Sequence, residues 1–172
     1  EPMSTPPVAA ADHAFEVWAP RPRRVRLWLE GAVHAMRRGA DDWWRVTAPA
    51  SPGARYGFLL DDDETVLPDP RSPRQPDGVH GPSALIPEVE GPRWAGRALR
   101  GAVVYELHIG AFTPEGTFDA AIERLPHLRD LGVGFVQVMP VNAFNGEHGW
   151  GYDGVGWFAV HEPYGGPSGL ER

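Results

Sequence analysis

The sequence contains no cysteine, so the 172 residues have neither a disulfide framework nor a thiolate metal site. It also contains no lysine: all 16 basic residues are arginines, against 23 acidic residues, and the net charge is −7. Because phosphate groups are bound by clustered positive charge, this balance argues against a nucleic acid or an anionic membrane as the partner. No run of 18 apolar residues is present, so no membrane-spanning helix is predicted.

The first residues, EPMSTPPVAAADH, lack a basic segment followed by an apolar core. No export signal is therefore predicted, and the expected location is the cytoplasm. The opening is rich in proline and alanine, and residues 1–12 are expected to be disordered or derived from a tag. The acidic composition suits neutral or cationic ligands, and no cofactor is expected.

The sequence pattern of residues 13–86 is typical of a small all-β module. Runs with apolar alternation, among them AFEVWAP, RVRLWLEG and RYGFLLDD, are separated by glycine and proline, with no helical stretch between them. This spacing predicts an antiparallel β-sandwich of the immunoglobulin-like type. Trp43 and Trp44 are adjacent on one expected strand and must point to opposite faces, so one of them belongs to the core. Residues 87–100 are predicted to be a linker.

Residues 101–172 change to an α/β pattern. AVVYELHIG and GVGFVQVMPV are nearly continuous apolar strands of the kind found in parallel sheets. Between them, TFDAAIERLPHLRDLG has apolar residues at helical spacing, with Thr117 placed to cap the helix and Gly132 to end it. Strand, helix and strand form a βαβ unit with a parallel strand pair.

One βαβ unit is only the beginning of an α/β barrel. A barrel of eight such units needs about 200 to 250 residues, so the chain is expected to be truncated and to hold only the first strand, first helix and second strand. The apolar faces and edges of these two strands are then expected to be open, which makes the piece alone poorly soluble or unstable.

A segment rich in aromatic residues and glycine, residues 142–167, follows the second strand. The βα loops at the carboxyl ends of barrel strands carry active sites, and flat aromatic rings suit the apolar faces of sugars. Polar neighbours in the loop are placed to hydrogen-bond sugar hydroxyl groups. The predicted substrate-binding residues are His148, Trp150, Tyr152 and Asp153. The alternative is that the rings only pack the loop against the barrel.

Two functional interpretations of polar residues, an acid/base pair and a metal site, are not favoured. Glu106 and His108 alternate on one face of the first strand, which suits proton transfer, but hydrogen bonds that satisfy both groups are the preferred explanation. His148, Asp153 and His161 fit no recognised ligand spacing, so no metal site is predicted.

The α/β half resembles a known family. VVYELHIGAFTPEGTFDAAIERLPHLRDLGVGFVQVMPV, followed by WGYDGVGWFAVHEPYGGP, is similar to the start of the catalytic domain of the alpha-amylase superfamily of glycoside hydrolases. DPRSPRQPDGVHGPS with ELHIGAFTPEGTF most resembles the members that release trehalose from maltooligosyl trehalose. The resemblance is strong from the linker onward, and the first 86 residues match only in general character.

The resemblance implies a (β/α)8 TIM barrel preceded by a β-sandwich. It implies maltooligosyl trehalose or another alpha-glucan oligosaccharide as the ligand, with Tyr152 of the GYD motif stacked on the sugar beside the scissile bond. It also implies a retaining mechanism with an Asp nucleophile and a Glu acid/base, whose carboxyl groups lie about 5 to 5.5 Å apart. Those residues follow later strands, so no catalytic residue is assigned to this chain and the chain alone is expected to be inactive.

Other functions remain open at this stage. A branching or debranching enzyme of the same superfamily would use the same two halves. A glucan-binding fragment without chemistry is a further alternative, although no clear row of exposed aromatic residues is recognised in the sandwich sequence. The oligomeric state is left open.

Overall fold

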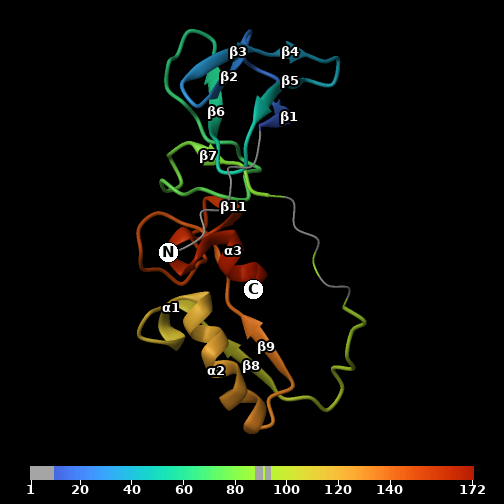
Figure 1. The fold of residues 1–172 in the computed structure, drawn as a ribbon, viewed down its shortest axis with the longest axis vertical. Coiled ribbons are helices and arrows are strands. Elements are labelled where there is room, and N and C mark those ends of the chain that lie inside the picture. Colours follow the sequence, from blue (N-terminus) through green and yellow to red (C-terminus); the bar gives the residue numbers. More distant parts are fainter. Residues whose placement is uncertain (1–9, 88–90, 92–93) are drawn as a thin grey trace, which may run out of the picture.

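The computed structural model describes residues 10–87, 91 and 94–172 (Figure 1). Residues 10–87 form antiparallel sheets, and residues 101–172 form a smaller part with helices and strands. In Figure 1 the sheets lie at one end of an elongated arrangement, and strands β8 and β9 lie at the other.

The N-terminal part has two antiparallel sheets. The order is β1-β5-β4 in the first sheet and β3-β2-β6-β7 in the second. The strands are β1 (Ala11–Trp18), β2 (Val25–Leu29), β3 (Ala32–Ala35), β4 (Arg37–Arg38), β5 (Trp43–Ala50), β6 (Arg55–Leu60) and β7 (Ser83–Ala84). The prediction of antiparallel sheets in this half is confirmed.

Strand β1 begins earlier than the sequence suggested. Ala11 pairs with Ala50 and Asp12 with Pro49 in the β1–β5 register. The prediction that residues 1–12 are disordered or derived from a tag is therefore wrong for Ala11 and Asp12, because backbone pairing with β5 extends the strand beyond its apolar pattern. Residues 1–9 lie outside the described residues.

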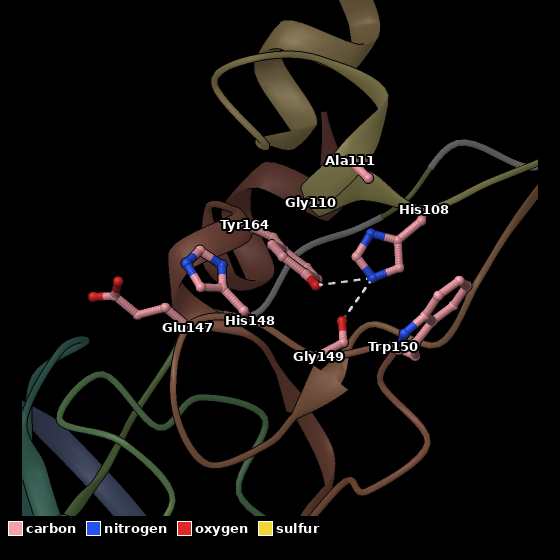
Figure 2. A pocket seen from close by; sticks show the side chains of 8 residues that line it. All are labelled: His108, Gly110, Ala111, Glu147, His148, Gly149, Trp150 and Tyr164. Carbon is pink, nitrogen blue, oxygen red and sulfur yellow. Dashed lines mark hydrogen bonds between the residues drawn. The ribbon is translucent and has the colours of Figure 1, made fainter.

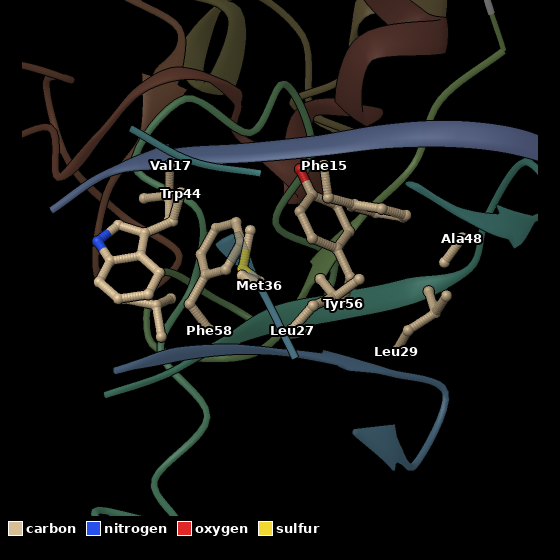
Figure 3. Close-up of a cluster of buried hydrophobic side chains, with 10 residues drawn as sticks. Phe15, Val17, Leu27, Leu29, Met36, Trp44, Ala48, Tyr56 and Phe58 are labelled. Atoms are coloured by element: carbon tan, nitrogen blue, oxygen red, sulfur yellow. The ribbon is translucent and has the colours of Figure 1, made fainter. Parts of the chain in front are cut away.

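One hydrophobic core lies between the two sheets (Figure 3). In β2, the alternating Val25, Leu27 and Leu29 are buried, as period-2 patterning requires. Trp44 of β5 is 5% exposed, and its Nε1 donates to the carbonyl oxygen of Ala19 at 2.9 Å. The buried core members are Phe15, Val17, Val25, Leu27, Leu29, Met36, Trp44, Ala48, Tyr56 and Phe58.

The neighbouring Trp43 faces away from this core. Its ring is partly exposed and lies 4.5 Å from the guanidinium carbon of Arg71, a cation–π contact. The expectation that Trp43 and Trp44 point to opposite faces is confirmed. In the β1–β5 register Trp43 is paired with Trp18, which is 57% exposed.

The second half contains the expected βαβ unit. Strand β8 (Val104–Leu107) pairs in parallel with β9 (Phe135–Val138), and α2 (Phe118–Asp130) connects them. Thr117 caps α2, because its hydroxyl accepts a hydrogen bond from the backbone N–H of Ala120 at 3.3 Å. Gly132 follows α2 with a φ of 85°, the left-handed conformation that glycine favours after a helix.

The open faces predicted for these strands are also observed. Val104 is 45% exposed, Val136 37% and Val138 40%, so only Leu107 at the end of β8 is buried in the strand pair. Leu107 belongs to a buried cluster that also contains Phe118, Ala121 and Leu128 of α2. The remaining apolar surface faces solvent in this chain.

Replacing Pro126 by alanine is expected to stabilise α2. Proline has no N–H to donate to the carbonyl of Ile122 one turn earlier, and Pro126 is exposed inside the helix. Restoring that hydrogen bond is expected to raise the free energy of unfolding by about 1 to 2 kcal/mol, after the greater freedom of the unfolded chain is counted. Thermal unfolding of the full-length protein measures the change.

The matched control for this experiment is Pro163→Ala. Pro163 is also exposed, but it sits in the first turn of the 3-10 helix η1 (Glu162–Tyr164), where no N–H is needed. The control variant is therefore expected to show no gain in stability. Equal gains in the two variants would contradict the assignment of the effect to the helix interior.

The segment after β9 has more regular structure than the sequence indicated. Strands β10 (Asn142–Ala143) and β11 (Gly156–Val160) pair antiparallel with a register shift, and α3 (Gly166–Glu171) follows η1. Helix α1 (Ile109–Phe112) directly after β8 was also not predicted. These elements are short, and α3 begins with Gly-Pro-Ser-Gly, so propensity does not reveal them.

The proline-rich segment after β6 packs against the β10–β11 pair. Arg74 forms an ion pair with Glu162, with 2.5 Å between Nη2 and Oε1. The backbone of Arg74 also forms an isolated parallel β-bridge with Val160. Val79 forms a small buried cluster with Ala143 and Ala159. This segment therefore connects the sheets to the aromatic segment through both charge and apolar burial.

The domain boundaries stay predictions. Of the predicted linker 87–100, the described residues, 87, 91 and 94–100, contain no helix or strand, and residues 88–90 and 92–93 lie outside the described part.

Candidate functional site

A cavity of about 420 Å³ lies at the carboxyl end of β8 (Figure 2). One wall comes from α1 and its N-cap residue His108, another from the glycine-rich loop between β10 and β11, and a third from η1. The lining residues are His108, Gly110, Ala111, Glu147, His148, Gly149, Trp150 and Tyr164. Parallel strands present their ligand sites at this edge, so the position suits a binding site.

The structure brings together two of the four predicted substrate-binding residues. His148 and Trp150 line the cavity. Tyr152 and Asp153 lie further along the same loop, both exposed, and do not line it. Trp150 is 71% exposed and Tyr152 74% exposed, so both rings offer flat apolar faces to a ligand. The roles of all four residues stay predictions.

His108 ties the loop to the end of β8. Its Nε2 lies 2.7 Å from the carbonyl oxygen of Gly149, and its ring centroid lies 6.2 Å from that of Trp150 in an edge-on arrangement. Glu106, two residues earlier, accepts a hydrogen bond from the side-chain amide of Gln137 on β9 at 2.9 Å. Glu106 and His108 therefore each have a hydrogen-bond partner, as predicted, although Nδ1 of His108 has none among the described residues.

Tyr164 closes the inner side of the cavity. The ring is 3% exposed and makes edge-on contacts with the rings of His108 and Phe118. A Cβ atom at Gly110 would lie 2.8 Å from Cε1 of Tyr164, so glycine is needed for this close approach. Tyr164 lies within the aromatic segment 142–167, but no sequence pattern connects it with His108, 56 residues away.

His161 lies behind the cavity, buried at 3% exposure and stacked on Phe144 with a centroid distance of 3.7 Å. Burial lowers the pKa of His161 below its ordinary value, and this effect outweighs the opposing influence of the Glu147 backbone and the charge of Asp153. The ring is thus held mainly by apolar packing in its neutral form.

This burial predicts a pH dependence of stability. The unfolded chain protonates His161 at about pH 6.5, whereas the folded protein binds that proton only at lower pH. The stabilisation is therefore fully present above about pH 6.5 and is lost as the pH falls through the lower folded-state pKa. Melting temperatures of the full-length protein, with and without His161→Gln, are expected to converge as the pH is lowered from about 7.5 to about 5.

The matched control is His127→Gln on the exposed surface of α2. Because the side chain of His127 is exposed, this substitution is expected to change the melting temperature at about pH 7.5 by less than His161→Gln does. A difference for His161→Gln that does not vary with pH would contradict the assigned role of burial.

Among residues 10–87, 91 and 94–172, no group of three or more His, Cys, Asp or Glu side chains is arranged to hold a metal ion. No helix in the described part of the chain has the length and apolar character needed to cross a membrane.

Comparison with known proteins identifies the relatives of the chain. The malto-oligosyltrehalose trehalohydrolase of Mycobacterium tuberculosis (strain H37Rv) is 61% identical over 165 residues, which are 92% of this chain and 28% of that protein. The chain is homologous to the N-terminal region of the malto-oligosyltrehalose trehalohydrolases, a family of glycoside hydrolases. The enzyme of the same name from Deinococcus radiodurans is 42% identical over 171 residues, 97% of this chain and 28% of that protein. No family model matches the chain.

The chain thus spans about 28% of the length of these relatives. A crystal structure described as that of a candidate alpha amylase from Salmonella typhimurium matches with a TM-score of 0.87 and 42% identity, over 94% of this chain and 29% of that one. A pullulanase from Anoxybacillus sp. LM18-11, complexed with maltotetraose, matches with a TM-score of 0.73 and 23% identity, over 91% of this chain and 29% of that one. The second likeness shows the fold alone.

Proposed function

We propose that the chain is the N-terminal part of an enzyme that releases trehalose from maltooligosyl trehalose. The observation that carries the proposal is a difference in identity. The trehalohydrolase of M. tuberculosis is 61% identical over 92% of the chain, whereas the 1,4-alpha-glucan branching enzyme of Bordetella parapertussis is 31% identical over 90% of the chain. The branching enzyme is therefore the second candidate.

In this proposal the β8–α2–β9 unit opens a (β/α)8 barrel, and the two N-terminal sheets form an immunoglobulin-like sandwich in front of it. The parallel pairing of β8 with β9 and the exposed apolar residues of both strands support this, since further strands and helices would cover them. The carboxylates of a retaining mechanism then lie outside these residues. The cytoplasmic location stays a prediction, which cell fractionation tests.

The ligand of the proposed enzyme is an alpha-glucan oligosaccharide. A mostly apolar cavity with a few polar groups is typical of small-molecule sites. In this proposal Trp150 lines the cavity and Tyr152 stacks on a sugar ring. His148 and Asp153 form hydrogen bonds with sugar hydroxyl groups. The complex of a similarly folded pullulanase with maltotetraose supports this ligand class.

The test is an assay of the full-length protein that contains this chain. Incubation with maltooligosyl trehalose is expected to yield free trehalose and a shortened maltooligosaccharide, separated by anion-exchange chromatography. Proton NMR of the first product formed is expected to show the α-anomer at the new reducing end, as a retaining mechanism requires. Absence of trehalose, together with new branch points in amylose, would replace the proposal by the branching enzyme.

A further inference from the structure

The cavity contains the hydroxyl of Tyr164, and the tautomer of His108 decides whether that hydroxyl can donate its proton to the His108 ring. The carbonyl oxygen of Gly149 can only accept a hydrogen bond, and Nε2 of His108 lies 2.7 Å from it. Nε2 must therefore carry a hydrogen. In the neutral ring this leaves the lone pair on Nδ1, a buried atom without a hydrogen-bond partner in the described part of the chain.

The hydroxyl oxygen of Tyr164 lies 3.4 Å from Nε2 of His108, the nitrogen that carries the hydrogen. Because Nε2 carries a hydrogen and has no lone pair left, the hydroxyl of Tyr164 cannot donate to it. No other hydrogen bond of this hydroxyl is found among the described residues. Its proton therefore remains free to be donated to another acceptor.

The surroundings hold the Tyr164 ring in one place. Phe118, Phe144, His108 and His161 all pack against it, with ring centroids between 4.7 Å (His161) and 6.4 Å (Phe118) from its own. Figure 2 shows its hydroxyl directed toward the His108 ring, among the residues that line the cavity. The donor is thus fixed in position by packing and lies in a space that a ligand can enter.

We propose that Tyr164 donates its hydroxyl proton to an oxygen atom of a glucosyl unit bound in this cavity, and that His108 is a positioning residue for that donor. The inference rests on the proposed function, from which it takes the alpha-glucan ligand. A sugar oxygen is a neutral acceptor, which matches a neutral hydroxyl donor in a cavity that is also lined by Trp150.

The first variant is Tyr164→Phe in the full-length protein, which removes the hydroxyl and keeps the packed ring. Its KM for maltooligosyl trehalose is expected to rise about 2- to 10-fold with kcat unchanged, the result of losing one neutral hydrogen bond made equally in the ground and transition states. The dissociation constant for maltotetraose is expected to rise by the same factor. The matched control is Tyr56→Phe, which loses a buried hydroxyl that donates to Asp69 at 2.9 Å. It is expected to lower the melting temperature without changing KM.

The positioning role of His108 is tested with two further variants. His108→Gln retains a side-chain N–H and is expected to keep most of the affinity, whereas His108→Ala is expected to raise KM at least as much as Tyr164→Phe. Since both residues serve one contact, the effects on KM in the double variant of His108→Ala and Tyr164→Phe are expected to be less than multiplicative. Multiplicative effects, or no recovery in His108→Gln, would overturn the role of His108.

The assays separate this inference from the proposed function. If the full-length protein releases trehalose and Tyr164→Phe changes neither KM nor maltotetraose binding, the inference is overturned and the function stands. If the unaltered full-length protein releases no trehalose but binds maltotetraose more tightly than the Tyr164→Phe variant does, the proposed trehalose-releasing function is overturned. The role of Tyr164 as a hydrogen-bond donor then stands. If the unaltered protein neither releases trehalose nor binds maltotetraose, both are overturned.

Discussion

Replacing Trp44 by alanine is expected to lower the free energy of unfolding of the sheet module by about 3 to 5 kcal/mol. The side chain is 5% exposed and lies in the core shared by the two sheets (Figure 3). Alanine leaves a large cavity there, because surrounding side chains relax only in part. The change also leaves the carbonyl oxygen of Ala19 without the hydrogen bond that the indole N–H donates.

The measurement is chemical denaturation of the full-length protein, followed by the fluorescence of its remaining tryptophans. The matched control is Trp18→Ala on the adjacent strand β1, where the ring is 57% exposed. Because little apolar area is lost there, the control is expected to cost about 1 kcal/mol or less. A cost for Trp44→Ala as small as that of the control would contradict the assignment of Trp44 to a closed core.

Replacing Gly151 by alanine is expected to reduce kcat/KM for maltooligosyl trehalose at least about tenfold, because a small displacement of binding groups has a large effect on the rate. Gly151 is buried between Trp150 and Tyr152 and has a φ of +81°. A Cβ atom there would overlap the carbonyl oxygen of Pro140, so the backbone has to move. Both aromatic rings move with it.

Gly146→Ala is the matched control in the same loop. Its φ is +91°, so it shares the strain of a left-handed residue with a side chain, but a Cβ atom there meets nothing within 4 Å. Both variants are expected to lower the melting temperature slightly, and only Gly151→Ala is expected to impair substrate turnover. Equal turnover in the two variants would show that the position of the loop between Trp150 and Tyr152 does not matter for the substrate.

Features encoded over a few neighbouring residues were predictable from the sequence. The alternation in β2 placed Val25, Leu27 and Leu29 on the buried face, and Thr117 and Gly132 marked the two ends of α2. Such signals depend on local backbone geometry and on the side-chain period of a strand or helix. The resemblance of the glycine- and aromatic-rich motifs likewise pointed to the family that the comparisons support.

The composition of the cavity depends on the tertiary structure and could not be predicted from the sequence. His108 meets the carbonyl of Gly149 across 41 residues and the hydroxyl of Tyr164 across 56 residues. These contacts depend on the path of the loop over the end of β8, and no periodic pattern in the sequence encodes that path. Sequence reasoning therefore named Trp150 and His148 from their residue types, whereas the His108 and Tyr164 pair emerged only when folding brought distant segments within hydrogen-bond distance.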